Sequence, residues 1–162
     1  MTEPVRIIRA PSRLEYRYTA GTAQSRFLKK IAEGRNVGQR CPECAKVYVP
    51  PRGSCPLCAV PTVEDVELSP KGTVTTFCIV NIPSQALSVP VPYVCADILL
   101  DGADIPFFHL IQECPVEDVR MGMRVEAVWV EREQLGPSVE SIRYFRPTGE
   151  PDAPFEKHKD YF

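Results

Sequence analysis

The sequence contains two matching segments, Cys41-Pro42-Glu43-Cys44 and Cys55-Pro56-Leu57-Cys58, separated by the short run 45–54. Each segment can present two thiolates from one tight turn, and two such turns can close a tetrahedral four-sulfur site around one soft cation. Two disulfides, or free thiols, are the alternative interpretation. The paired spacing favours a metal site, because it follows the pattern of metal-binding cysteines and nothing else marks the chain as secreted.

A metal held by four cysteines has no position open for water or substrate, which indicates a structural ion. Zn–S bonds of roughly 2.3 Å would tie both turns to one point and give a small ribbon something to fold around. Iron in the same sulfur cage would make a rubredoxin-like electron carrier, and the spacing leaves this alternative open. Zinc is favoured, since an electron carrier needs no further attached domain.

The bulk composition is that of an ordinary globular protein. The chain has 162 residues, 44% hydrophobic and 25% charged, and a net charge of −2. This charge gives no general attraction to nucleic acid. No apolar run reaches the ~18 residues of a membrane helix, and no signal peptide is recognisable. The three cysteines left over are Cys78, Cys95 and Cys114; the odd number favours a cytoplasmic protein, with Cys78 and Cys95 buried and inert.

The amino-terminal part predicts an extended arm over about residues 1–20, followed by a short amphipathic helix. Phe27 and Ile31 fall on one face of this helix, Thr22 or Ser25 can cap its start, and Gly34 is placed to end it. The ribbon follows. It begins near residue 40 and contains a small hairpin strand in which apolar and polar residues alternate.

From residue 71 onward the pattern is strand after strand, without a convincing helix. Five apolar, β-branched runs in so short a stretch are typical of an OB-type barrel, with a sandwich as the competing architecture. The predicted strands are 72–82, 93–100, 105–112, 124–132 and 139–146. The predicted fold is therefore mainly β: an N-terminal helical arm (1–39), a four-cysteine zinc ribbon (40–68), a five-stranded OB-fold barrel (69–147) and a tail (148–162).

Several motifs together resemble one family, the zinc-ribbon (rubredoxin-like) plus OB-fold proteins that accompany thiolases and related acyl-CoA enzymes. The resemblance spans about residues 24–147. Its carrying segments are Phe27-Leu28-Lys29-Lys30-Ile31-Ala32-Glu33-Gly34, Gln39-Arg40-Cys41-Pro42-Glu43-Cys44, Pro50-Pro51-Arg52, Cys55-Pro56-Leu57-Cys58, Gly72-Thr73-Val74, Pro92-Tyr93-Val94 and Met121-Gly122-Met123-Arg124-Val125.

The resemblance implies a non-catalytic accessory subunit. Such proteins assemble with a thiolase-fold partner as hetero-oligomers, and their barrel can bind the CoA part of an acyl-CoA. The partner then supplies the nucleophilic cysteine and the acid–base histidines for acyl transfer, condensation or retro-aldol cleavage of sterol side chains. Structural zinc and bound acyl-CoA are the implied cofactor and ligand.

The residues themselves agree with a non-catalytic role. His109 alternates with apolar residues in a strand and is expected to be a barrel residue, whereas His158 lies among charged tail residues and is expected to be solvated. No nucleophile–base pattern or glycine-rich phosphate loop is recognisable. Three aspartates near one turn, Asp97, Asp101 and Asp104, are expected to be turn formers that could otherwise bind a cation.

Single-stranded nucleic-acid binding is the alternative function, because OB barrels and zinc ribbons both occur in nucleic-acid-binding proteins. The predicted barrel strands carry little basic charge, however. Their aromatic residues fall in apolar runs typical of a core: Phe77, Phe107, Phe108 and Trp129. Acyl-CoA would need only a few cations for its phosphates. The weak candidates near the junction of helix, ribbon and barrel are Lys29, Lys30, Arg35, Arg40, Arg52 and Lys71.

Two further segments are candidate contact regions. The tail 148–162 contains Phe155, Tyr161 and Phe162, and aromatic residues so close to a chain end favour a segment that docks on a partner. The apolar loop 83–92 would suit a lid or a partner contact; its alternative role is packing over the barrel mouth.

Overall fold

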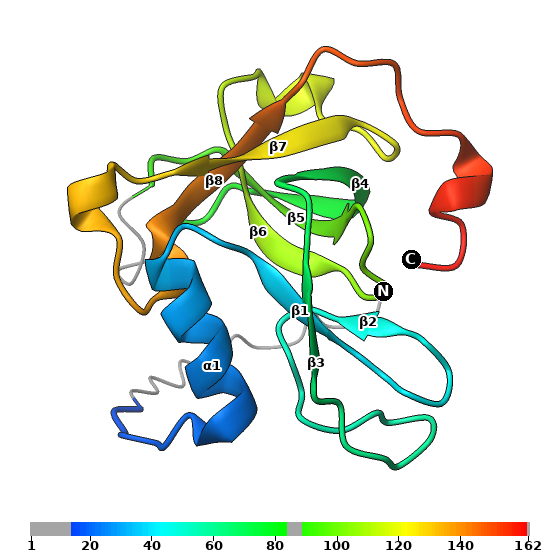
Figure 1. The fold of residues 1–162 in the computed structure, drawn as a ribbon. Coiled ribbons are helices and arrows are strands. Elements are labelled where there is room, and N and C mark those ends of the chain that lie inside the picture. The colour runs from blue at the N-terminus through cyan, green and yellow to red at the C-terminus, as the bar shows by residue number, and fades with distance from the viewer. Residues whose placement is uncertain (1–13, 84–88, 162) are drawn as a thin grey trace, which may run out of the picture.

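The computed structural model describes residues 14–83 and 89–161. Figure 1 shows the long helix and a small sheet lying together against one end of a barrel. The described elements confirm the mainly β fold, in which helix, ribbon and barrel follow one another along the chain. Among the described residues, no helix combines the length and the apolar character needed to cross a bilayer.

The helix α1 covers Gly21–Ala32 and lies where the sequence predicts it. The face of the helix that carries Phe27 and Ile31 is buried. Gly34 adopts a left-handed φ of 75°, which permits its N–H to donate to the carbonyl of Ile31 at 2.9 Å. The predicted side-chain cap is wrong: Ala20 occupies the N-cap position and no side chain bonds there, because the helix starts earlier than the Thr22 or Ser25 caps require.

The ribbon is a three-stranded sheet, whose order is β2-β1-β3. Its strands are β1 (Val37–Arg40), β2 (Val47–Tyr48) and β3 (Glu64–Glu67), all paired antiparallel. Strand β3 was not expected from the sequence. Three of its four residues are acidic and exposed, so it lacks the apolar alternation that identifies a strand, and only its pairing with β1 reveals it.

The barrel is closed, with strand order β4-β5-β6-β8-β7, which confirms the OB-type barrel over the sandwich. Strands β6 and β8 pair in parallel, at Ile111 and Phe145, and the other neighbours pair antiparallel. The strand bounds are β4 Lys71–Val80, β5 Tyr93–Leu100, β6 Phe107–Ile111, β7 Arg124–Trp129 and β8 Ile142–Pro147.

Four short 3-10 helices lie between or after these strands, namely η1 Val116–Asp118, η2 Arg132–Gln134, η3 Val139–Ser141 and η4 Phe155–Lys157. Because of two of these 3-10 helices, two of the predicted strands are shorter than expected. The last strand begins at Ile142 rather than Val139, because η3 occupies the three preceding residues. The preceding strand ends at Trp129, just before η2.

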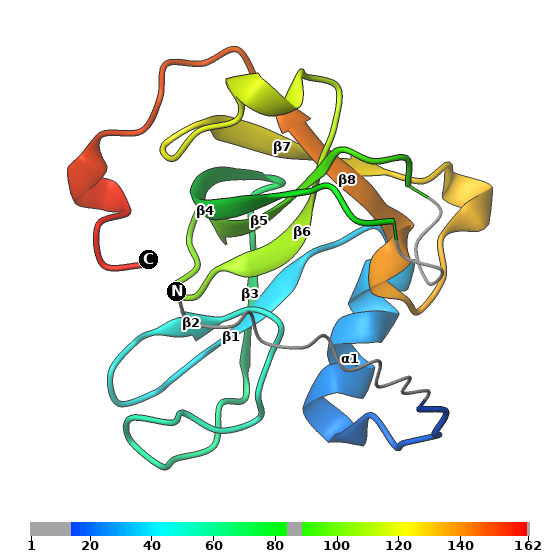
Figure 2. The same cartoon turned by 180° about the vertical axis from the view of Figure 1, so that it is seen from behind.

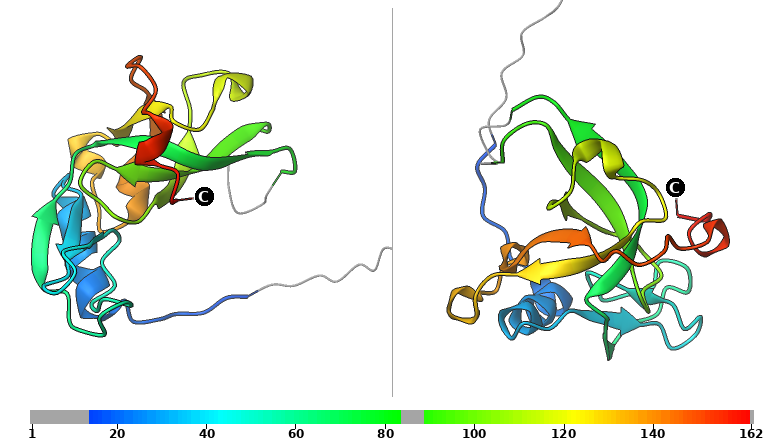
Figure 3. Two further views of the ribbon diagram at one scale, coloured as in Figure 1. Left: turned by 90° about the vertical axis from the view of Figure 1, so that its right-hand side faces the viewer. Right: turned by 90° about the horizontal axis from the view of Figure 1, so that it is seen from above.

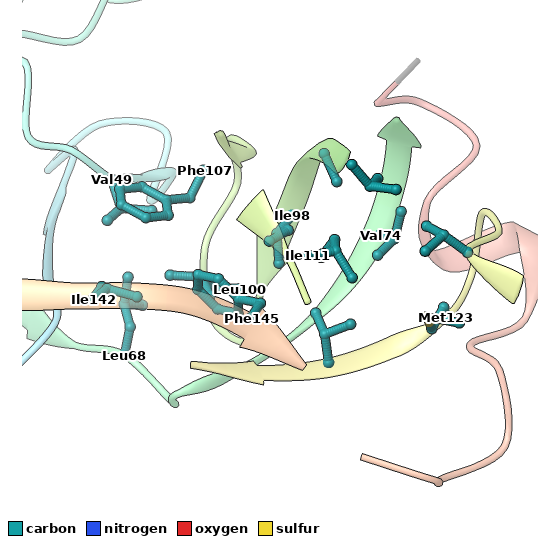
Figure 4. Packing of buried hydrophobic residues seen from close by; sticks show 14 of the residues in the cluster. Val49, Leu68, Val74, Ile98, Leu100, Phe107, Ile111, Met123, Ile142 and Phe145 are labelled. Atoms are coloured by element: carbon teal, nitrogen blue, oxygen red, sulfur yellow. The ribbon is translucent and has the colours of Figure 1, made fainter. Parts of the chain in front are cut away.

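One continuous hydrophobic core joins the helix, the ribbon and the barrel. It includes Ile31 of α1, Val49 just after β2, Leu68 after β3 and Phe145 of β8. Figure 4 shows Val49, Leu68, Phe107, Ile142 and Phe145 at one end of the barrel interior, and Val74, Ile98, Ile111 and Met123 further along it. The ribbon therefore has a fixed position on the barrel.

The predicted core aromatic residues divide into two groups. Phe107 is buried, while Phe77 and Trp129 are partly buried and pack against the core. Phe108, by contrast, is 63% exposed, so the prediction for this residue is wrong. Neighbouring side chains on a strand point to opposite faces, and since Phe107 points into the barrel, Phe108 must point out.

The tail runs back along the barrel after β8, as Figures 1 and 2 show. The N–H of Ala153 donates to the carbonyl of Gly122 at 2.8 Å, and Arg120 pairs with Asp152 at 2.6 Å. His158, expected to be solvated, is only 4% exposed, because this packing covers it. Phe155 remains 57% exposed.

The arm before α1 has no regular secondary structure over residues 14–20. It runs away from the body of the protein, as Figure 3 shows. Its large side chains are exposed: Leu14 by 83%, Tyr16 by 76% and Tyr18 by 70%. The rest of the predicted arm, residues 1–13, lies outside the described residues, as do Ala86 and Leu87 of the predicted apolar loop.

Candidate functional site

The two cysteine segments form equivalent turns. In the first, the N–H of Ala45 donates to the carbonyl of Cys41 at 3.0 Å; in the second, the N–H of Ala59 donates to that of Cys55 at 2.9 Å. Ala45 and Ala59 both have a left-handed φ, of 60° and 56°. A non-glycine residue rarely adopts this conformation, so its occurrence at the same place in both turns indicates one shared local geometry.

The turns bring the four predicted ligands together. The Sγ atoms of Cys41, Cys44, Cys55 and Cys58 all lie within 4.8 Å of one another. Four Zn–S bonds of roughly 2.3 Å in a tetrahedron require sulfurs about 3.8 Å apart. The Sγ atoms of Cys44 and Cys55 are separated by 3.7 Å, so the donor set and its spacing fit a tetrahedral zinc ion.

Tyr48 supports this cluster from within the ribbon. Its buried hydroxyl lies 3.2 Å from Cys55 Sγ. Burial by itself raises the pKa of the Cys55 thiol, but the hydrogen bond from Tyr48 and two backbone N–H groups lower it to about 6. The hydrogen bond that Cys58 donates to Cys44, together with burial, raises the pKa of Cys58 to about 12. Four thiolates this close therefore need a cation before all of them can ionise.

Asp104 joins the ribbon to the barrel. Its carboxylate accepts a 2.8 Å hydrogen bond from the N–H of Val47, and its own N–H donates to the Val47 carbonyl at 2.9 Å. The other two aspartates also have structural partners: Asp97 accepts from the Thr76 hydroxyl at 3.1 Å, and Asp101 from Arg124 at 2.8 Å. Asp101 and Asp104 lie in the connection that follows β5, but Asp97 lies within β5, so the expectation that it forms a turn is wrong.

The sequence interpretation missed Tyr48 and Asp104 as supports of the ribbon. Tyr48 shows only as one aromatic residue between Val47 and Val49, a pattern that predicts a strand and gives no sign of a bond to sulfur. Asp104 contacts a residue 57 positions away. Local patterns contain no information about such a pairing.

The candidate phosphate-binding cations do not form one cluster, and most have acidic partners. Lys30 pairs with Glu33 at 2.9 Å, Arg35 with Glu67, and Lys71 with Glu150, while Arg40 lies 3.4 Å from Glu64. Lys29 and Arg52 have no ion pair with a carboxylate of residues 14–83 or 89–161. The Arg52 guanidinium lies 5.8 Å from the ring centroid of Tyr48.

Arg52 and the first turn of α1 line the same surface hollow, which has a volume of ≈ 530 Å³. It is lined by residues 20–24 and 51–53. The first turn carries no acidic residue and its N-cap side chain makes no hydrogen bond, so its N–H groups have no side-chain acceptor at the cap. Of the candidate cations, Arg52 has the surroundings that best suit an anion.

The two histidines lie in separate places, and both are mostly covered. His109 Nδ1 accepts a hydrogen bond from the N–H of Leu110 at 2.9 Å, and its ring lies 5.7 Å from that of Phe145. Burial lowers the pKa of His109 despite two backbone hydrogen bonds that raise it. His158 contacts Phe155 under the tail. His109 is thus a barrel residue, as the sequence predicts.

An apolar hollow of ≈ 510 Å³ lies on the outside of the barrel, and we call it the barrel groove. Its apolar side chains come from β6, from η3 and β8, and from the end of the 83–92 connection. Polar groups occur mainly at His109, Glu140 and Arg143. The lining residues are Val89, Cys95, Phe108, His109, Leu110, Val139, Glu140, Ile142 and Arg143.

Comparison with known families divides the chain into two matched regions. Residues 29–64 match the family described as "ChsH2, rubredoxin-like zinc ribbon domain", and residues 65–130 match "ChsH2, C-terminal OB-fold domain". The first region contains all four clustered cysteines, and the second contains β4, β5, β6 and β7.

Similar curated proteins carry the name "DUF35 domain-containing scaffold protein". The one from Methanocaldococcus jannaschii is 42% identical over 95 residues, a match that covers 57% of this chain and 66% of that protein. The one from Pyrococcus furiosus is 31% identical, and the match covers 64% of this chain and 76% of that protein.

Two solved structures share the fold. A chain of the "Ltp2-ChsH2(DUF35) aldolase" superposes with a TM-score of 0.61 at 23% identity, covering 81% of this chain and 98% of that one. A DUF35-family protein of unknown function from Sulfolobus solfataricus gives a TM-score of 0.58 at 18% identity, covering 78% of this chain and 84% of that one.

Proposed function

This chain belongs to the DUF35 family of zinc-ribbon and OB-fold proteins, and from that membership we propose that it is a non-catalytic accessory subunit. In this proposal it assembles with a thiolase-like enzyme and helps that enzyme to handle an acyl-CoA. The partner carries out the bond-making or bond-breaking step, either condensation or retro-aldol and thiolytic cleavage of a side chain, with sterol side chains as one candidate.

The observation that carries the proposal is that the described cysteines, aspartates and histidines have structural surroundings. The four cysteines converge on one closed site, and each of the three aspartates accepts a hydrogen bond from another part of the fold. The two histidines lie in different parts of the fold, against Phe145 and Phe155 respectively. A catalytic site needs a nucleophile or acid–base group oriented by a second and a third group, and no such set is assembled among the described residues.

The metal in this proposal is structural zinc. Its ligands would be Cys41, Cys44, Cys55 and Cys58, whose sulfur spacing suits a tetrahedral ion. With all four positions taken by cysteine, the ion would stabilise the ribbon and leave substrate binding to other parts of the chain. A cytoplasmic location suits thiol ligands, since a reducing compartment keeps them unoxidised.

The names of similar proteins support a thiolase-like partner. Similar proteins are named scaffolds, and the fold recurs in a protein whose name couples it to an aldolase. The chain also has exposed apolar side chains. Leu14, Tyr16 and Tyr18 project from the arm and Phe155 from the tail, and aromatic side chains of this kind often anchor protein interfaces.

Acyl-CoA binding is the finer part of the proposal. The pantetheine and acyl chain need an apolar slot, and the barrel groove provides one with few polar groups. The phosphates need a small number of cations. Arg52 beside the start of α1 is the best-placed of the candidates, while Lys30, Arg35 and Lys71 would first have to leave their carboxylate partners.

The proposal is tested by purifying the tagged chain from its native cell, identifying the proteins that remain bound by mass spectrometry, and measuring metal in the same sample. We expect a thiolase-fold protein in near-equal amount and about one zinc per chain. A variant truncated after Thr148 serves as the matched control for the tail. Recovery of the chain alone, or with RNA, would overturn the accessory role, and iron in place of zinc would favour electron transfer.

A further inference from the structure

Two cysteines that the proposed function leaves unused lie directly opposite each other on the outside of the barrel. Cys78 of β4 pairs with Cys95 of β5 in the antiparallel ladder. The residues of β5 alternate strictly between buried and partly exposed, with Val94 and Ala96 buried, so Cys95 points outward. Residues directly opposite in a ladder share a face, and Cys78 is indeed exposed.

This placement corrects the expectation that both cysteines are buried. Cys78 is exposed, Cys95 is partly exposed, and neither forms a disulfide. The apolar run 72–82 suggested a buried strand, but β4 extends beyond the part of the barrel that covers it: Cys78 and Ile79 near its end are both exposed.

The ladder geometry suits a bond between the two sulfurs. Directly opposed residues in an antiparallel pair have Cα atoms about 4.5–5.5 Å apart, within the roughly 4.4–6.8 Å found for disulfides. Their Cβ atoms are about 4.5–5.5 Å apart, whereas a disulfide needs about 3.5–4.5 Å. The two ranges meet at about 4.5 Å, so a small approach of the strands is enough to close the bond.

The two thiols differ in a way that assigns them separate roles. Cys78 is open to solvent, so a small disulfide can reach it. Cys95 is less exposed and also lines the barrel groove. Burial raises the pKa of Cys95, and the charge of the neighbouring Cys78 raises it further. Cys78 is therefore the thiol that meets the oxidant, and Cys95 is the one that resolves the intermediate.

We propose that Cys78 and Cys95 are a reversible redox site, which closes to a disulfide by exchange with a low-molecular-weight disulfide such as oxidised glutathione. The Cys78 thiolate attacks one sulfur of that disulfide, forming a mixed disulfide and releasing one thiolate. The Cys95 thiolate then attacks Cys78 Sγ and releases the second. Two cysteine thiols are oxidised, one external disulfide is reduced to two thiols, and the two protons pass to water and the released thiolates.

Closure of this bond changes the wall of the barrel groove. It pulls the Cys95 sulfur toward β4 and away from Leu110, its neighbour on β6, and both residues line the groove. Whether that change alters ligand binding rests on the proposed function of the groove. The redox site itself does not rest on that function, so the redox proposal and the proposed function can fail independently.

The test treats the zinc-loaded full chain with oxidised glutathione, blocks the remaining thiols, and maps the peptides by mass spectrometry. We expect a cross-linked peptide pair containing Cys78 and Cys95, which dithiothreitol reverses while zinc remains bound. Cys114→Ser is the matched control, because Cys114 lies after β6, outside this ladder, and its loss should leave the cross-link unchanged.

Two variants separate the roles of the thiols. Cys95→Ser should trap glutathione on Cys78 as a stable mixed disulfide, because no resolving thiol is present. Cys78→Ser should abolish the cross-link and leave Cys95 mostly unmodified. A stable mixed disulfide on Cys78 in the unaltered chain, or a chain in which neither thiol reacts, would overturn the proposal, and neither result depends on whether the variants fold.

Discussion

The hydroxyl of Tyr48 can be removed with almost no change of shape by the substitution Tyr48→Phe. This hydroxyl lies 3.2 Å from Cys55 Sγ, and the tyrosine is only 2% exposed, so water has little access to replace the lost hydrogen bond. Removing a group that hydrogen-bonds a metal ligand typically lowers metal affinity by about 10- to 100-fold. We expect a loss in this range, because Tyr48 is the side-chain hydroxyl that lowers the pKa of Cys55.

The assay is a competition for zinc between the protein and a chromogenic chelator at constant pH, followed by absorbance. Tyr93→Phe is the matched control, since Tyr93 lies on the barrel strand β5 and its loss should leave zinc affinity unchanged. Circular dichroism of both variants checks that the barrel is still folded. Equal zinc affinity for Tyr48→Phe and the unaltered chain would refute the reasoning that this hydrogen bond tunes the sulfur cluster.

Three further predictions concern the ribbon, the core and the tail. Cys44→Ser removes one of four ligands, so metal analysis should show loss of zinc and limited proteolysis should cut the ribbon; full occupancy would contradict this. Phe145→Ala empties a site that is 0% exposed, which should cost about 3–5 kcal/mol and lower the Tm by roughly 6–20 °C in a thermal melt; a change under about 1 kcal/mol would show that the core collapses around the gap. Truncation after Thr148 should weaken partner binding in a titration of the two purified proteins while circular dichroism shows a folded barrel; unchanged affinity would exclude the tail as a docking segment.

The metal cluster was the most predictable part of the molecule. Two Cys-x-x-Cys segments each fix two sulfurs by local turn geometry, and a four-sulfur site requires only that the turns meet. The helix and the five barrel strands were also recognisable, because Phe27 and Ile31 follow the helical period and the strand runs are rich in β-branched residues. Strand β3 was missed since its acidic residues carry no such signal.

The less predictable features depend on partners far away in the sequence. His158 is buried because the tail packs against the barrel near Gly122, a contact that no local pattern encodes. The carboxylate partners of the candidate cations were likewise not predictable from the sequence: Arg35 pairs with Glu67, and Lys71 with Glu150. Each of these pairings follows from the path of the folded chain.

The sequence by itself determined the class of this protein: a helix, a four-cysteine ribbon and a barrel, in that order. Turn chemistry and hydrophobic periodicity act over a few residues, so they can be read from the sequence alone. Only the tertiary structure decided which face each side chain occupies. It placed Cys78 opposite Cys95, and Tyr48 beside Cys55, because strand register and the shared core bring together residues that are distant along the chain.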